Sequence, residues 1–92
     1  MTYALVLSPD AEAQLDEWNK SGQTAVLRKL AKLFDELENH PMTGTGKPER
    51  LKGDLKGFWS RRITKADRMI YKIDGDKILV GIVSLKGHYG DK

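Results

Sequence analysis

The stretch of residues 58–85, FWSRRITKADRMIYKIDGDKILVGIVSL, carries the pattern that decides the fold. It divides into three runs rich in β-branched and aromatic residues, at positions 58–63, 68–73 and 77–85. Asp74 and Gly75, between the second and third runs, form a dipeptide typical of the turns that join antiparallel strands. This stretch therefore predicts three consecutive strands in an antiparallel arrangement.

The residues before this stretch predict one more strand and two helices. Residues 2–7 (TYALVL) form a short apolar run, which we expect to be a strand buried on both faces. Ser8 can cap a helix in which Pro9 takes the first position. That helix and a second one, at about 23–39, both carry an apolar stripe at helical spacing: Ala11, Leu15 and Trp18 in the first, and Val26, Leu27, Leu30, Leu33, Phe34 and Leu37 in the second.

The expected fold is α+β, in the element order β-α-α-β-β-β. Ninety-two residues suffice for one domain with one modest core, so we expect a single domain spanning residues 1–92. Two helices from the N-terminal half should pack on one face of a mostly antiparallel sheet.

Alternation along the strands divides the side chains of residues 58–73 between two faces. In the first strand, Phe58, Ser60 and Arg62 share one face, and Trp59, Arg61 and Ile63 share the other. In the second strand, the apolar set of Met69, Tyr71 and Ile73 should face the helices, which leaves Arg68 and Lys72 toward solvent. If the strand register places Arg62 on that side too, the open face of the sheet presents a cationic cluster.

The charges of the chain are unevenly distributed. Sixteen Lys and Arg residues stand against thirteen Asp and Glu residues overall. Residues 47–72 hold most of the excess, with Lys47, Arg50, Lys52, Lys56, Arg61, Arg62, Lys65, Arg68 and Lys72 against Glu49, Asp54 and Asp67. A concentrated basic half is typical of a protein that binds a polyanion.

Composition also argues against several kinds of site. The chain has no cysteine and only two histidines far apart, so neither a disulfide nor a metal site is expected. The glycine-containing loop at 43–48 lacks the Lys-Ser/Thr ending of a phosphate-binding P-loop, and no cofactor is expected. There is no membrane-spanning apolar run and no signal peptide pattern, so we expect a cytoplasmic protein without a membrane partner.

Cleavage of RNA without a metal needs three kinds of group. A base must help the ribose 2′-hydroxyl attack the neighbouring phosphate, and an acid must protonate the departing 5′-oxygen. Cations must stabilise the extra negative charge of the transition state, a task for which the planar guanidinium of arginine is suited. Glutamate can serve as the base, and histidine, with a reference pKa of ~6.5, can serve as the acid.

Four segments of the chain carry such groups in a recognisable order. They are 46–52 (GKPERLK), 55–64 (LKGFWSRRIT), 68–71 (RMIY) and 88–89 (HY). This pattern resembles the YoeB (Txe) toxins of the RelE/ParE superfamily, and the resemblance covers nearly the whole chain. It implies a RelE-like fold similar to microbial ribonucleases. It also implies the toxin of a type II toxin–antitoxin pair, an endoribonuclease that cleaves messenger RNA in the ribosomal A site.

The resemblance implies a role for each residue of the site. Glu49 would be the general base and His88 the general acid. Arg62 and Arg68 would hold the scissile phosphate, and Tyr89 would help to position the nucleotide.

Further contacts and partners follow from the same resemblance. Lys52 and Arg61 are candidate contacts to the RNA backbone. The implied partners are a cognate, YefM-like antitoxin, messenger RNA with the ribosome, and a second copy of the chain in a homodimer. We expect the antitoxin to use an acidic, partly disordered segment.

Two other functions remain open at this stage. The first is a ParE-like toxin that cleaves no RNA and acts on a protein such as DNA gyrase; the presence of Glu49, Arg62 and His88 disfavours it. The second is a basic RNA-binding module, whose binding would depend strongly on salt and would yield no product.

Overall fold

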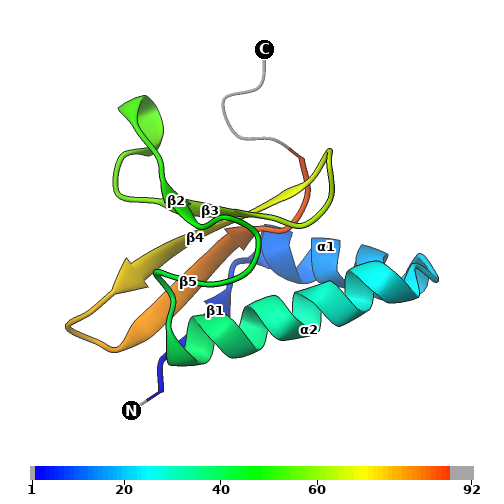
Figure 1. The fold of residues 1–92 in the computed structure, drawn as a ribbon, viewed down its shortest axis with the longest axis horizontal. Helices are drawn as coiled ribbons and strands as arrows, with labels where there is room; N and C mark the ends of the chain where they lie inside the picture. Colours follow the sequence, from blue (N-terminus) through cyan, green and yellow to red (C-terminus); the bar gives the residue numbers. More distant parts are fainter. Residues whose placement is uncertain (1, 88–92) are drawn as a thin grey trace.

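Two helices pack against one face of a five-stranded sheet in the computed structural model, which describes residues 2–87 (Figure 1). The elements follow in the order β1 (Ala4–Leu7), α1 (Pro9–Lys20), α2 (Thr24–Asn39), β2 (Glu49–Arg50), the short 3-10 helix η1 (Gly53–Leu55), β3 (Trp59–Arg62), β4 (Arg68–Asp74) and β5 (Leu79–Ser84). The expected α+β fold is confirmed, with one additional strand, β2.

The sheet has the strand order β1-β5-β4-β3-β2. β1 runs parallel to β5, and the three other pairings are antiparallel. The expectation of a mostly antiparallel sheet is therefore confirmed. The additional strand β2 lies at one edge, paired only with β3, and β1 forms the opposite edge.

The first strand is less buried than its apolar sequence predicts. Its side chains alternate between exposed and half-buried, with Ala4 and Val6 exposed and Leu5 and Leu7 packed toward the helices. The prediction of a strand buried on both faces is wrong, because β1 lies at the edge of the sheet and no layer covers its outer face among residues 2–87.

The hairpin between β4 and β5 is longer than the sequence predicts. Asp74 pairs with Leu79, so the turn occupies residues 75–78 and β5 begins at Leu79 instead of at residue 77. Asp74 still contributes to the turn, because its carboxylate accepts a hydrogen bond of 3.2 Å from the backbone N–H of Lys77.

The start of α1 is fixed by Ser8, as its sequence predicts. The Ser8 hydroxyl oxygen accepts a hydrogen bond from the backbone N–H of Ala11 at 3.0 Å, and Pro9 occupies the first helical position. The same hydroxyl donates to the carbonyl of Val83 at 2.7 Å, which joins the helix to β5.

Within residues 2–87, no helix is both long and apolar enough to span a bilayer.

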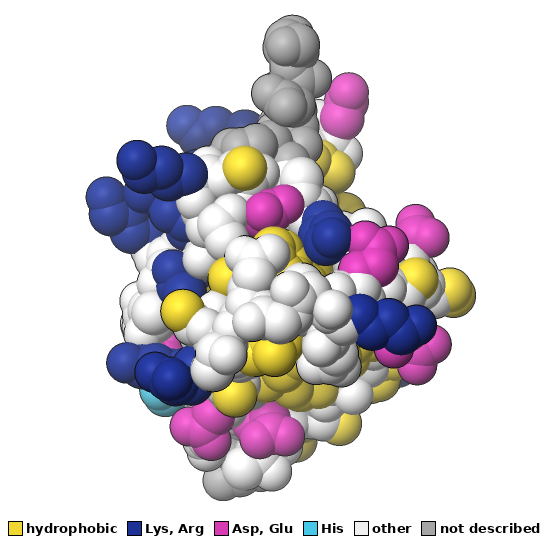
Figure 2. All heavy atoms as spheres, turned by 90° about the vertical axis from the view of Figure 1, so that its right-hand side faces the viewer, with side chains coloured by type: hydrophobic (Ala, Val, Ile, Leu, Met, Phe, Trp, Pro, Cys, Tyr) yellow, Lys and Arg dark blue, Asp and Glu magenta, His cyan; other side chains and the backbone are white. Residues whose placement is uncertain are grey.

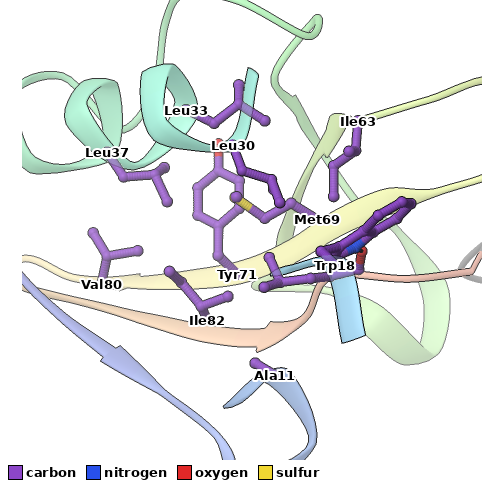
Figure 3. Packing of buried hydrophobic residues seen from close by; sticks show 11 residues of the cluster. Ala11, Trp18, Leu30, Leu33, Leu37, Ile63, Met69, Tyr71, Val80 and Ile82 are labelled. Carbon is purple, nitrogen blue, oxygen red and sulfur yellow. Dashed lines mark hydrogen bonds between the residues drawn. The ribbon is translucent and has the colours of Figure 1, made fainter. Parts of the chain in front are cut away.

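The core lies between the helices and the sheet (Figure 3). Leu30, Leu33 and Leu37 of α2 pack over Met69 and Tyr71 of β4, and the set is completed by Ala11, Trp18, Ile63, Val80, Ile82 and Leu85. The Trp18 indole N–H donates to the carbonyl of Leu85 at 2.9 Å, so its polar atom is satisfied in the core. Met69 and Tyr71 face the helices, so their neighbours along β4 lie on the opposite face of the sheet, called the open face because neither α1 nor α2 covers it. This face is not exposed throughout, because Ile70 is only 7% exposed there.

Candidate functional site

The open face of the sheet brings together three of the site residues that the sequence predicts. Glu49 pairs with Ser60 across β2 and β3, and Arg62 pairs with Arg68 across β3 and β4. Directly paired residues point to the same face of a sheet. Glu49, Arg62 and Arg68 therefore share one face, and the side of Arg62 that alternation left open is settled by the register.

Glu49 and Arg68 form an ion pair across the strand between them. The Arg68 Nη1 atom lies 3.6 Å from the Glu49 Oε1 atom. The Glu49 side chain is 52% exposed and that of Arg68 is 17% exposed. Because the Glu49 side chain is half exposed, solvent weakens this ion pair relative to a fully buried one. An anion bound on this face can therefore compete with Glu49 for the Arg68 guanidinium.

The loop before β2 is held against β3 by a glycine. The carbonyl of Gly46 accepts a hydrogen bond of 2.7 Å from the backbone N–H of Arg62. Gly46 has a φ of +83°, and a Cβ atom on it would lie 2.8 Å from the Arg62 carbonyl oxygen. This close approach places the segment that leads to Glu49 directly beside Arg62.

A Gly46→Ala substitution should displace this segment. Both Gly46→Ala and Gly53→Ala introduce backbone strain of about 1–2 kcal/mol, because each residue has a positive φ. Only position 46 adds a collision, since nothing lies within 4 Å of a Cβ at Gly53. We expect urea denaturation to show a clearly larger loss for Gly46→Ala than for Gly53→Ala. Equal losses would mean that the contact with Arg62 does not constrain the loop.

Arg61 does not belong to the surface, and the prediction that it contacts the RNA backbone is wrong. Its side chain is 0% exposed and points to the core face, next to Tyr71. Its five N–H groups make five hydrogen bonds: to the Tyr71 hydroxyl (3.0 Å), to the Glu36 carboxylate (2.6 Å), and to the carbonyls of Thr45 (3.2 Å), His40 (3.2 Å) and Thr43 (2.7 Å). No donor remains for a phosphate.

The Glu36 carboxylate completes this buried network. It accepts hydrogen bonds from the backbone N–H of Thr45 at 2.7 Å and from the Thr45 hydroxyl at 2.8 Å. Burial alone would raise the pKa of Glu36, but the hydrogen bonds from Thr45 and the charge and hydrogen bond of Arg61 outweigh burial and lower that pKa below its ordinary value. The ion pair links α2 to β3, and the hydrogen bonds that its two side chains make with the loop of residues 40–46 hold this loop against both elements. The loop comes just before Glu49 in the sequence.

Tyr71 is the third member of the network. Its hydroxyl accepts from Arg61 and donates to the carbonyl of Pro41 at 2.9 Å. Burial raises the pKa of Tyr71 above its ordinary value, so the phenol stays neutral and able to donate at physiological pH. The sequence analysis did not predict that Arg61, Glu36 and Tyr71 form a buried hydrogen-bond network.

The position of Lys52 is compatible with the predicted contact to the RNA backbone, because its side chain is exposed. Lys52 lies in the connection between β2 and β3. Together with Arg50, Lys56, Phe58 and Trp59 it lines a cleft whose walls are mostly apolar and which includes three cationic residues. The Arg50 guanidinium stacks over the Trp59 ring at 5.3 Å from its centre.

His88 and Tyr89 lie outside the described residues. The described chain ends at Gly87, whose carbonyl accepts a hydrogen bond of 2.9 Å from the backbone N–H of Arg68. The Gly87 N–H donates to the Asp67 carboxylate at 2.9 Å. The residue that precedes His88 in the sequence is thus bonded to the start of β4, where Arg68 lies.

The surface shows the charge separation that the sequence predicts. In Figure 2, most Lys and Arg side chains gather along the left side of the molecule, and most Asp and Glu side chains lie to the right and at the lower end. Among residues 2–87, no three His, Asp or Glu side chains gather as a metal site requires.

Comparison with known proteins identifies the family. Residues 8–89 match the family model described as the YoeB-like toxin of the bacterial type II toxin–antitoxin system. The toxin YoeB of Streptomyces coelicolor is 40% identical over 72 residues, which cover 78% of this chain and 82% of the relative.

Solved structures agree with this assignment. A YoeB/ParE toxin from Agrobacterium tumefaciens superposes with a TM-score of 0.86 at 31% identity, covering 94% of this chain and 99% of that one. YoeB of Staphylococcus aureus, solved as a dimer and in a heterotetrameric complex with YefM, gives TM-scores of 0.80 and 0.79 at 31% identity, covering 95% of this chain and 98% of that one. The chain therefore belongs to the YoeB-like toxins of bacterial type II toxin–antitoxin systems.

Proposed function

We propose that this toxin is a metal-independent endoribonuclease that cleaves messenger RNA in the ribosomal A site. The observation that carries the proposal is the convergence of Glu49, Arg62 and Arg68 on the open face of β2, β3 and β4. A carboxylate and two guanidiniums at adjoining register positions offer a base and two phosphate ligands within one short span of sheet.

The proposed reaction divides the steps among the groups as follows. Arg62 and Arg68 bind the non-bridging oxygens of the scissile phosphate, which draws Arg68 away from Glu49. Glu49 accepts the proton of the ribose 2′-hydroxyl as its oxygen attacks phosphorus. His88 donates a proton to the departing 5′-oxygen, and Tyr89 positions the nucleotide. The products are a 2′,3′-cyclic phosphate on the upstream fragment and a free 5′-hydroxyl on the downstream fragment.

The charge distribution supports a polyanionic substrate. Arg50 directly follows Glu49 in the sequence, Lys52 comes two residues later, and the side chains of both are exposed. We assign to Lys52 a contact with the RNA backbone next to the scissile phosphate. Cations at this position raise the encounter rate with the ribosome-bound message and make it sensitive to salt.

The test uses purified toxin and a message engaged in translation. Primer extension should find new 5′ ends within codons that occupy the A site, and the downstream fragments should carry 5′-hydroxyl groups. Binding without new ends would leave only an RNA-binding module. Intact message together with stalled DNA gyrase would replace the nuclease by a ParE-like activity.

We further propose that a YefM-like antitoxin and a second copy of the chain are the partners of this toxin in the cytoplasm. The S. aureus relative, solved as a dimer and with YefM, supports both partners. Saturating the toxin with its cognate antitoxin should suppress message cleavage, and sedimentation should detect a dimer of the free toxin. Full activity of the saturated complex would contradict the proposed antitoxin, and a strictly monomeric toxin would contradict the dimer.

A further inference from the structure

Ser60 is a buried hydroxyl without a hydrogen-bond partner. It lies in β3 and is 0% exposed, and its Oγ atom is the buried side-chain atom of the described residues for which no partner is found. Burying a hydroxyl without a partner costs free energy, which an alanine at the same position would avoid. Such an atom in a folded protein calls for an explanation, and a functional role is one that the position of Ser60 supports.

The location of Ser60 suggests what that role is. Ser60 is the register partner of Glu49 on one side and of Ile70 on the other. β3 lies between β2 and β4, so the Arg68 side chain must cross β3 to approach Glu49. Because Arg68 is paired with Arg62, two residues beyond Ser60, this crossing runs alongside the Ser60 side chain.

We propose that Ser60 is a positioning residue of the ribonuclease site, whose hydroxyl donates a hydrogen bond to the Glu49 carboxylate once a substrate phosphate has drawn Arg68 away. The proposal rests on the function proposed above. Side chains of directly opposed residues have Cβ atoms about 4.5–5.5 Å apart, a separation that a hydroxyl and a glutamate can bridge.

The hydrogen bond has a specific use at this step. In the free toxin the Arg68 guanidinium lies 3.6 Å from the Glu49 carboxylate. When Arg68 turns to the phosphate, Glu49 has to face the 2′-hydroxyl with one oxygen while the other is held. A hydroxyl fixed in the middle of β3 can hold it, and an O–H donated to a carboxylate favours the ionised form that accepts a proton.

Substitution of Ser60 should affect the stability of the toxin and its cleavage rate differently. Ser60→Ala removes a hydroxyl that has no partner in the free toxin, so the melting temperature should stay the same or rise. The rate of message cleavage at saturating toxin should fall by about 10-fold or more, as expected for the loss of a hydrogen bond to a charged group. The acid limb of the pH–rate profile should move to higher pH, and Ser60→Thr, which keeps the hydroxyl, should restore most of the rate.

A second measurement tests the proposal independently of cleavage. The probe is a short RNA with a 2′-methoxy group at the cleavage position, added to toxin with ¹³C-labelled glutamate carboxyls. The Glu49 carboxyl signal should be alike in the wild-type and Ser60→Ala toxins when free, and should differ between them when this RNA is bound. If the wild-type toxin cuts no message, the proposed function fails, but the signal still decides the role of Ser60.

Two outcomes would overturn the proposal. One is a Ser60→Ala toxin with the wild-type rate, an unchanged pH profile and an unchanged carboxyl signal in the RNA complex. The other is a marked drop in the melting temperature of Ser60→Ala, which would assign the hydroxyl a structural role in the free protein.

Discussion

A Glu49→Gln toxin is expected to cleave a translated message about 10²–10⁴-fold more slowly than the wild-type toxin, which is the range that one general base supplies. The amide matches the carboxylate in size but cannot accept the proton of the 2′-hydroxyl. Because the Glu49 side chain is 52% exposed, its replacement should change the free energy of unfolding by no more than about 1 kcal/mol. The loss of cleavage rate should therefore come from the missing base and not from unfolding. A measurement of the free energy of unfolding on the same sample checks this.

The matched control is Glu38→Gln, which makes the same chemical change at an exposed position of α2 away from the open face. Its cleavage rate should equal that of the wild type. His88→Gln should lower the rate by a similar factor, because it removes the proposed acid. If Glu49→Gln and His88→Gln both cut ribosome-bound message at the wild-type rate, the acid–base mechanism is wrong.

The sequence predicted the open face well because strand alternation is a local property. Arg62 and Arg68 each lie on a strand whose apolar partners mark the core side, so their common face followed once the register was known. The register itself depends on pairing between separate segments of the chain. So does the ion pair between Glu49 of β2 and Arg68 of β4, which spans β3. β2 was missed because it has only two residues, Glu49 and Arg50, which carry no strand pattern of their own.

The misassignment of Arg61 has a different cause. Alternation placed Arg61 on the face of Trp59 and Ile63, which is the core face, but its charge suggested a surface role. Its partner Glu36 also occupies a core position, between Leu33 and Leu37 of the apolar stripe of α2. Two opposite charges at core positions of a helix and a strand are the signal of a buried ion pair, and each half was visible in the sequence.

Arg61→Met is expected to cost the free protein about 3–5 kcal/mol, the range found when one member of a buried ion pair is removed. The Glu36 carboxylate would stay buried without its counter-charge, and the carbonyls of His40, Thr43 and Thr45 would lose a donor. A domain of this size is stable by only about 5–15 kcal/mol, so the loss is a large fraction of the total. Urea denaturation at pH 7 measures it, with Arg28→Met at an exposed position of α2 as the control, for which a change within about 0.5 kcal/mol is expected.

The stability lost in Arg61→Met should depend on pH in a definite direction. The pKa of Glu36 is lowered in the folded wild-type protein, so its contribution to stability is present above its ordinary value of 4.5 and is lost as the pH falls through the lower folded value. In Arg61→Met the charge and hydrogen bond of Arg61 are lost while the two hydrogen bonds from Thr45 remain, so the pKa of Glu36 lies above its value in the wild-type protein and the carboxylate is protonated at a higher pH. The stability difference between the two proteins should therefore narrow from pH 7 toward pH 4. A difference that stays constant or widens on acidification would mean that the charge of Glu36 is not what Arg61 balances.

The double variant Arg61→Met/Glu36→Gln separates the two parts of the loss. If an unpaired carboxylate causes most of it, replacing Glu36 as well should recover most of the stability, because a neutral amide at that position carries no uncompensated charge. The loss that remains measures the hydrogen bonds from Arg61 to the loop of residues 40–46. Since this loop leads to Glu49 and pairs through Gly46 with Arg62, a double variant that is stable but cleaves slowly would show that the network positions the site as well as the fold. A double variant as unstable as the sum of its single changes would exclude the coupling between Arg61 and Glu36.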